Sequence, residues 1–230
     1  MGEVRVMRIV VVAVAMLAWL TVGGCTSSSG GPPELESNLT YDGLAKVKNS
    51  KARGAWMRPD FSLAGYTKIM LAGAGIEYRP VKKVSRAAAS TASQFPLSEE
   101  QKERLRSVVS DAFRTELAQS QKFQIVDQPG PDTLTIWGGL IDVVSYVPPD
   151  AVGRSNIYLS SVGEATLVVE IRDSESNATL VRIIDRKAAQ SYGITQRSTS
   201  VTNWSEVQQL ARTWATQLRN SLDEAVTWDN

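Results

Sequence analysis

Residues 165–188 read ATLVVEIRDSESNATLVRIIDRKA, and their pattern predicts the central hairpin of the fold. Leu167, Val169 and Ile171 occupy alternate positions in its first half, which is the period of a strand with one buried face. The polar residues 174–177 separate this run from a second apolar run. Two runs of this kind, joined by a short polar turn, predict an antiparallel hairpin.

Further strands are expected on both sides of the hairpin. They are predicted at residues 68–76, 123–126 and 133–146, where short apolar runs are bounded by turn residues. The pair Gly138–Gly139 inside the last run is typical of a bulge or of a close approach of the backbone. These runs extend the hairpin into a sheet.

Two segments have the apolar period of amphipathic helices. Ser98 begins the first, and Gln101 completes a capping-box pattern three residues later. Asn203 is expected to cap the second, with Glu206 three residues later. A sheet and two helices with one apolar face each bury those faces against one another. We therefore predict an α/β fold: a two-layer sandwich with a mixed, mostly antiparallel sheet of about five strands and both helices packed on one face.

The N-terminus has the order of a secretory signal. Arg5 and Arg8 precede the uncharged residues 9–24, a run shorter than the roughly 20 residues that span a bilayer as a helix. Residues 22–25, Val-Gly-Gly-Cys, resemble the lipobox of bacterial lipoproteins, with the single cysteine, Cys25, at the cleavage point. The alternative is an ordinary secreted protein with an incidental cysteine.

The lipoprotein resemblance implies that the Cys25 thiol receives a diacylglycerol and that its new amino group is acylated. Two or more acyl chains hold a protein stably on a membrane. The next residue is Thr26 rather than aspartate, which favours the periplasmic face of the cell outer membrane. The lipid anchor therefore makes the membrane one expected partner.

Composition narrows the possible functions. The chain has 25 basic and 24 acidic residues and no histidine. Without residues 1–24 it has 23 of each, and a neutral chain has no general attraction for nucleic acid. Without histidine there is no serine–histidine–aspartate triad and no histidine-ligated metal. We therefore expect no nucleic-acid partner, no cofactor, no metal and no enzymatic activity.

The chain divides into four parts. Residues 1–24 form the predicted signal peptide, and residues 25–38, rich in serine, glycine and proline, form a lipidated flexible tether. Residues 39–66 have many apolar and aromatic side chains without a clear period, so an irregular segment packed on the domain is expected there. Residues 67–228 form the α/β domain.

Several runs resemble an uncharacterised family of bacterial lipoproteins, catalogued as domain of unknown function 3313. The resemblance covers most of residues 39–222 and implies no activity. The runs that carry it are WMRPDF at 56–61, FPLSEE at 95–100, PGPD at 129–132, GEA at 163–165, Asn203–Trp204 and Trp214–Ala215.

Two kinds of residue are candidates for a contact surface. Tryptophan outside the helices can anchor a partner if it is exposed, and basic clusters can contact lipopolysaccharide phosphates or anionic headgroups. A solvated loop is the commoner reason for such a basic cluster. The candidate residues are Trp56, Arg58, Trp137, Arg79, Lys82, Lys83 and Arg86.

Acidic residues on or beside the predicted strands allow a second interpretation. Two carboxylates about 5–10 Å apart can cleave a glycosidic bond. Ion pairing with Arg172, Arg182, Arg186 or Lys187 on the solvent face of the sheet is the favoured alternative. The acidic residues are Asp142, Glu164, Glu170, Asp173 and Asp185.

The function expected from these features is that of a membrane-anchored periplasmic lipoprotein that binds or assembles envelope proteins without catalysis. One alternative is a carboxylate-dependent hydrolase that acts on envelope glycans. The other is a lipoprotein that binds a lipid or a small ligand between sheet and helices, which requires a sizeable apolar cavity.

Overall fold

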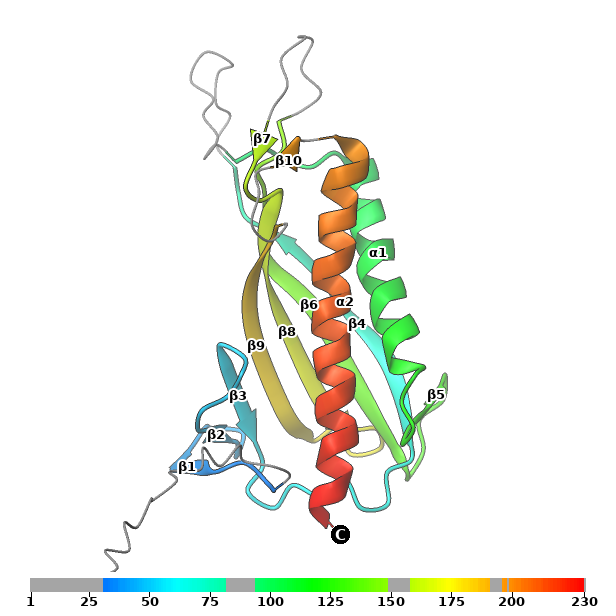
Figure 1. The fold of residues 1–230 in the computed structure, drawn as a ribbon. Coiled ribbons are helices and arrows are strands. Elements are labelled where there is room, and N and C mark those ends of the chain that lie inside the picture. Colours follow the sequence, from blue (N-terminus) through cyan, green and yellow to red (C-terminus); the bar gives the residue numbers. More distant parts are fainter. Residues whose placement is uncertain (1–30, 82–93, 149–157, 191–195, 198, 230) are drawn as a thin grey trace, which may run out of the picture.

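The computed structural model describes residues 31–81, 94–148, 158–190, 196–197 and 199–229. The predicted signal peptide, Cys25 and the basic residues Lys82, Lys83 and Arg86 lie outside these ranges. One large sheet and two long helices make up most of the described chain (Figure 1).

The main sheet has eight strands in the order β1-β2-β3-β9-β8-β6-β4-β5. Strand β4 pairs in parallel with β5 and β6, and every other pair in this sheet is antiparallel. The mixed, mostly antiparallel sheet is therefore confirmed. The strands are β1 (Leu35–Leu39), β2 (Ala45–Val47), β3 (Gly54–Met57), β4 (Lys68–Tyr78), β5 (Gln124–Val126), β6 (Thr133–Ser145), β8 (Gly163–Asp173) and β9 (Thr179–Ala189).

The expected number of strands, about five, is too small. Strands β1, β2 and β3 lie in residues 35–57, where the sequence predicts a tether and an irregular segment. They have only three to five residues each, too few for an alternating pattern to stand out. A separate two-stranded sheet joins β7 (Tyr158–Leu159) to β10 (Gln196–Arg197).

The hairpin that the sequence predicts is formed by β8 and β9. Val169 pairs with Ile183, and Ile171 pairs with Val181, so the apolar side chains of both strands share one face. In the turn, Asn177 has φ of 57°, and the Ser176 N–H donates to Asp173 Oδ1 at 2.7 Å. Local hydrogen bonds therefore stabilise the turn that sets the register of the hairpin.

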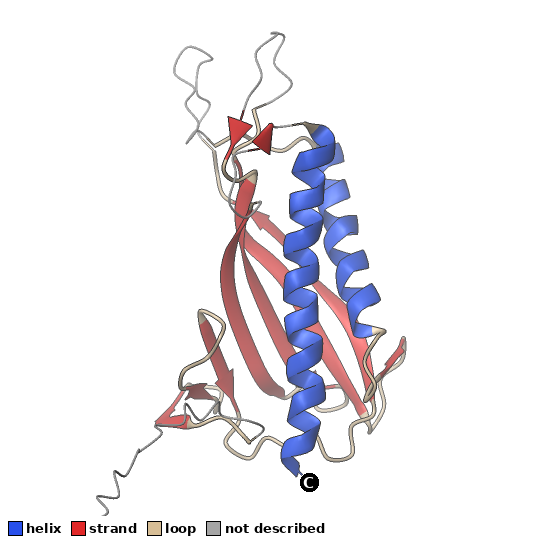
Figure 2. Ribbon diagram, viewed as in Figure 1, coloured by secondary structure: helices blue, strands red, loops and turns tan. Residues whose placement is uncertain are grey.

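Both long helices, α1 (Glu99–Leu117) and α2 (Ser200–Ala225), cover the same face of the sheet, as predicted (Figure 2). The capping box of α1 is confirmed, because the Gln101 N–H donates to Ser98 Oγ and the Ser98 N–H donates to Gln101 Oε1. A short 3₁₀ helix, η2 (Val226–Asp229), follows α2. Within the described residues, neither helix is long and apolar enough to cross a membrane.

Helix α2 begins three residues before the predicted cap. The Asn203 N–H donates to the Thr199 carbonyl at 2.9 Å, so Asn203 lies inside the first turn rather than capping it. Helix ends vary by one or two residues even between assignments, and asparagine has only a modest cost inside a helix. The preceding Ser-Val-Thr sequence therefore extends the helix by about one turn.

The glycine pair of β6 lies at a bulge, but the extra residue belongs to the neighbouring strand. Gly138 pairs with Gly73 and Gly139 with Gly75, so that the β4 residue between Gly73 and Gly75 has no partner. Gly75 has φ of 92°, a conformation that glycine adopts without a steric cost. The prediction found the place of the bulge but assigned it to the wrong strand.

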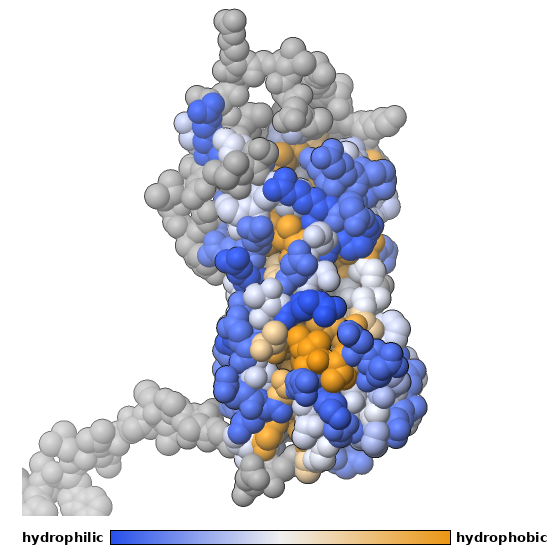
Figure 3. Space-filling model, turned by 90° about the vertical axis from the view of Figure 1, so that its right-hand side faces the viewer, coloured by the Kyte–Doolittle hydropathy of each residue, from blue (hydrophilic) through white to orange (hydrophobic). Residues whose placement is uncertain are grey.

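The core lies between the sheet and the helices. Its fully buried members include Ile69, Leu117, Leu134 and Val169, and α2 adds Trp214. Figure 3 shows the side of the molecule formed by α1, β4 and β5, where an apolar patch is surrounded by hydrophilic residues. The half-buried apolar side chains that these elements bring to the edge of the core are Leu71, Val109, Phe113 and Ile125.

Candidate functional site

The face of the sheet opposite the helices is the candidate site. Among the described residues, no helix covers it (Figure 2). Trp56 on β3 pairs with Arg182 on β9, Arg182 pairs with Glu170 on β8, and Glu170 pairs with Trp137 on β6. Directly paired residues point to the same side of a sheet. The two tryptophans singled out from the sequence therefore lie in one row on this uncovered face, where both are half-buried instead of fully exposed.

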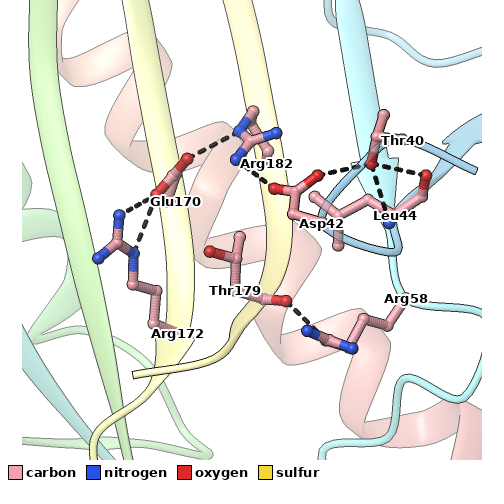
Figure 4. A network of polar contacts seen from close by, with 8 residues as sticks. All are labelled: Thr40, Asp42, Leu44, Arg58, Glu170, Arg172, Thr179 and Arg182. Atoms are coloured by element: carbon pink, nitrogen blue, oxygen red, sulfur yellow. Dashed lines mark hydrogen bonds and ion pairs between the residues drawn. The ribbon is translucent and has the colours of Figure 1, made fainter. Parts of the chain in front are cut away.

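A first group of ion pairs, the Glu170 network, consists of Asp42, Glu170, Arg172 and Arg182 (Figure 4). The Arg182 Nε–H donates to Glu170 Oε1 at 2.7 Å, and its Nη2–H donates to Asp42 Oδ2 at 2.6 Å. The Arg172 Nε–H donates to Glu170 Oε2 at 2.9 Å. Burial opposes ionisation of Glu170, but the hydrogen bonds from Arg172 and Arg182 outweigh it and lower the pKa of this carboxyl.

The Glu170 network also orders its surroundings. The Arg172 guanidinium lies 5.3 Å from the ring centre of Trp137, within the range of a cation–π interaction. Asp42 belongs to the turn between β1 and β2, so its ion pair with Arg182 fastens that turn to the sheet.

A second group, the Asp142 network, consists of Arg79, Asp142, Glu164 and Arg186. Both arginines form ion pairs with both carboxylates, and Arg186 Nη1 also donates to Thr166 Oγ1 at 3.1 Å. The hydrogen bonds from Arg79, and then those from Arg186, hold the pKa of Asp142 well below its usual range, although burial opposes them. Both networks therefore hold ionised carboxylates.

A bulge in the pairing of β6 with β8 sets the position of Asp142. Asp142 lies where the register between β6 and β8 shifts, between Ile141 and Val144, and it has φ of 56°. This left-handed conformation is uncommon outside glycine, although aspartate tolerates it better than most residues. The bulge thus places the Asp142 carboxylate beside Arg79 and Arg186.

An apolar stripe separates the two networks. Gly54, Ile184, Val168 and Gly139 pair in one row across β3, β9, β8 and β6, and Ile141 on the same face is 41% exposed. The Trp56 ring folds back over Gly54, because its Cη2 lies 2.6 Å from the position that a Cβ on Gly54 would take. A half-buried apolar surface therefore runs between two rows of ion pairs.

The charges on this face balance. Each network contains two arginines and two carboxylates, so neither has a net charge. A general acid in glycoside cleavage needs a raised pKa, whereas the pKa values of Asp142 and Glu170 are lowered. The arrangement suits contact with a neutral partner better than proton transfer or the binding of phosphate.

The favoured pairing of carboxylates with basic residues is confirmed for Asp142, Glu164 and Glu170. Asp142 and Glu164 do approach each other, as a hydrolase requires, but they share Arg79 and Arg186.

The two remaining acidic residues have other surroundings. Asp185 pairs with Lys187 at 2.8 Å, yet it accepts a hydrogen bond from Trp214 on α2 and so faces the helices instead of solvent. Asp173 accepts hydrogen bonds from Tyr66 and Ser176. The predicted solvent-face pairing is therefore wrong for Asp185, because its side chain alternates toward the core. It is also wrong for Asp173, whose side-chain partners in the described chain are Tyr66 and Ser176 instead of a basic residue.

Four residues of the predicted contact surface lie in the described chain. Trp56 and Trp137 share a row, Arg79 belongs to the Asp142 network, and the Arg58 Nε–H donates to the Thr179 carbonyl at 2.8 Å. The sequence interpretation named Arg182 and Arg186 as ion-pair partners of the acidic residues but did not include them in the contact surface. Residues 182, 184 and 186 have the period of two that puts them on one face of β9, and this is the signal that could have placed both arginines there.

A cleft between β9 and α2 can be compared with the cavity that the lipid-binding or ligand-binding alternative requires. The cleft has a volume of about 160 Å³ and is lined by Lys187, Ala188, Gln190, Glu206, Gln209, Leu210 and Thr213. Sites for drug-sized ligands have roughly 300–1,000 Å³ and mostly apolar walls. This cleft is smaller and is lined mainly by polar and charged residue types, so it does not match a lipid site. The described chain also contains no cluster of three acidic or thiol side chains placed to hold a metal ion.

These features define a class: an α/β domain with two helices on one face of an open sheet and a charge-balanced opposite face. The chain belongs to the family described as protein of unknown function (DUF3313), whose model matches residues 34–218. The family resemblance seen in the sequence is thereby confirmed. None of the curated proteins matches the chain.

Solved structures of low similarity were also found. A Xanthomonas campestris protein that matches family model DUF330 is 13% identical, with a TM-score of 0.41, and 75% of this chain covers 91% of that one. The PelC dodecamer from Paraburkholderia phytofirmans is 8% identical, with a TM-score of 0.35 and coverages of 74% and 96%. At these values the likeness assigns neither a function nor a partner.

Proposed function

We propose that this protein is a non-enzymatic binding module of the cell envelope, acylated at Cys25 and held on the periplasmic face of the outer membrane. Its partner is a protein that binds to the uncovered face of the sheet. The sequence supports the anchor through the lipobox-like residues 22–25 and Thr26.

The observation that carries the proposal is the apolar stripe between the Glu170 and Asp142 networks. Apolar surface rimmed by polar groups is typical of a protein-binding site. Tryptophan and arginine are the residues that most often dominate such interfaces, and here Trp137 stacks with Arg172 beside the stripe. Because the networks are charge-balanced, the partner needs no strong charge of its own.

The lowered pKa values of Asp142 and Glu170 favour this function over the carboxylate-dependent hydrolase. A catalytic acid must carry a proton near neutral pH, and arginine partners oppose that state. The small polar cleft beside α2 gives no support to a lipid carrier.

Site-specific photo-crosslinking in native membranes tests the proposal. A photoreactive residue at Ile141, on the uncovered face, should capture a partner protein. The matched probe at Ser110, an exposed residue on α1, should not. The Cys25→Ser variant shows whether capture needs the anchor. If the acylated protein remained uncrosslinked from both positions in every growth condition, the proposed function would be wrong.

A further inference from the structure

The turn between β1 and β2 presents two unusually exposed side chains. Tyr41 is 98% exposed and Leu39 is 59% exposed, so Tyr41 is the most exposed large apolar or aromatic residue of the described chain. Only Thr40 lies between them. Exposed apolar groups next to one another indicate a contact surface more strongly than scattered ones do.

The turn is held in one conformation. The Thr40 N–H donates to the Leu44 carbonyl at 2.8 Å. The Thr40 hydroxyl also contacts the Leu44 carbonyl, and the Leu44 N–H donates to Thr40 Oγ1, both at 3.0 Å (Figure 4). Gly43 has φ of 82°, which favours glycine. Asp42 accepts hydrogen bonds from both Thr40 and Arg182. Tyr41 is therefore presented on an ordered support, which lowers the entropy lost on contact.

The position of the turn in the chain points to what it contacts. Residues 1–30 lie outside the described structure, and the described chain begins next to β1 (Figure 1). Leu35 follows Cys25 by ten residues, which span at most about 36 Å when fully extended. Strand β1 is thus the first regular element that the structure describes after the proposed lipid anchor, and the turn follows it directly.

Most charges on and beside this hairpin are in ion pairs, while the Arg58 guanidinium, close to Gly43, donates to the Thr179 carbonyl. Lys46 lies 3.3 Å from Glu36, Lys48 pairs with Glu34, and Asp42 pairs with Arg182. A contact with lipid would therefore be apolar and aromatic instead of electrostatic. Tyrosine is enriched at membrane–water interfaces, where its ring lies among the headgroups.

From these observations we infer that Leu39 and Tyr41 insert into the lipid surface to which Cys25 is anchored. The inference depends on the proposed acylation of Cys25. Because Asp42 fastens the same turn to Arg182, this second contact fixes the direction in which the uncovered face of the sheet points. A protein held by the acyl chains alone would have no preferred orientation.

The test uses the full acylated protein in vesicles of phosphatidylethanolamine and phosphatidylglycerol. An environment-sensitive fluorophore is attached at Asn38→Cys, an exposed position of β1, while acylation blocks Cys25. The control carries the label at Glu103→Cys on α1. We expect a blue shift and quenching by nitroxide-labelled lipids at position 38 and neither at position 103.

Substitutions then identify the side chains responsible. Tyr41→Ser and Leu39→Ser should each reduce the blue shift and the quenching at position 38. Tyr158→Ser removes another exposed tyrosine, on β7, and should leave both unchanged. Equal effects of Tyr41→Ser and Tyr158→Ser would contradict the inference.

The remaining outcomes separate the two proposals. Mass spectrometry and flotation with the vesicles report whether Cys25 is acylated and membrane-bound, and a failure there overturns the anchor and with it this inference. The protein can be acylated and float with the vesicles while the label at position 38 behaves like the label at position 103. That result overturns the lipid contact of Leu39 and Tyr41 but not the anchor. A signal that occurs in native membranes but not in protein-free vesicles assigns the turn to a protein partner and also overturns it.

Discussion

Trp214 on α2 donates its indole N–H to the carboxylate of Asp185 on β9 at 2.9 Å, inside the interface between helix and sheet. Asp185 is only 7% exposed. Its other oxygen accepts the Arg53 N–H at 3.2 Å, and Lys187 completes an ion pair. One buried carboxylate thus connects α2, β9 and the residue that precedes β3.

We expect Asp185→Ala to lower the free energy of unfolding by about 2–3 kcal/mol, because it leaves the buried indole N–H of Trp214 without an acceptor. Asp185→Asn keeps an acceptor and should cost less. Urea unfolding followed by circular dichroism measures the difference, with Glu175→Ala on the exposed β8–β9 turn as the control. Equal losses for the Ala and Asn variants would contradict the role of this hydrogen bond.

The stability of the protein should fall in acid. Asp142 and Glu170 have lowered pKa values in the folded state, so the unfolded chain binds protons at a higher pH than the folded chain does. The stability that these carboxylates contribute is complete above their unfolded pKa values, near 4, and is lost as the pH drops below them. Urea unfolding between neutral and acid pH measures this loss.

Asp142→Asn serves as the control for the acid effect. This variant lacks one titrating carboxyl but keeps the shape of the side chain, so its stability should depend less steeply on pH. If the variant and the natural chain lost stability in parallel, the Asp142 network would not be a source of the acid sensitivity.

Gly54→Ala should disturb the uncovered face. An added Cβ would lie 2.6 Å from Cη2 of Trp56, so the ring must move, and overpacking of this kind costs typically about 1–3 kcal/mol. Gly73→Ala on β4 is a matched control, because a Cβ there meets nothing within 4 Å. The measurements are urea unfolding and tryptophan fluorescence.

A double variant tests the cause. Trp56→Ala removes the ring, so adding Gly54→Ala to it should cost less than Gly54→Ala costs alone, as expected for residues in contact. Strictly additive losses would show that the ring does not limit this position.

We expect the phenol of Tyr66 to lose its proton at a higher pH than an ordinary tyrosine does. Burial, and then the hydrogen bond that its O–H donates to Asp173 Oδ2 at 2.9 Å, raise the pKa of Tyr66 to about 12. The stability it contributes is complete below its unfolded pKa, near 10, and is lost as the pH rises toward the folded value. Subtracting the phenolate absorbance of the Tyr66→Phe variant from that of the natural chain isolates the signal of Tyr66. This difference should rise near pH 12 in the folded protein and near pH 10 in urea. A rise near pH 10 in both conditions would contradict the buried hydrogen bond.

Features that depend on near neighbours in the chain could be predicted from the amino-acid pattern alone. The alternation of Leu167, Val169 and Ile171 sets the buried face of β8, and the Ser98–Gln101 capping box sets the start of α1. Strand and helix periods are read over a few residues, so one apolar face on each element already requires a two-layer sandwich. The family resemblance also follows from local runs of sequence, and the family model that matches residues 34–218 confirms it.

Contacts between residues far apart in the chain depend on the order of the strands in the folded protein. Strands β1–β3 are too short to show a period, and the pairing of β3 with β9, which joins all three to the sheet, depends on which edge of the sheet is left open. The row from Trp56 to Trp137, the ion pair of Asp42 with Arg182 and the burial of Asp185 against Trp214 all follow from that strand order. Side chains far apart in the sequence become neighbours through the order of the strands in the sheet, and the local pattern does not encode that order.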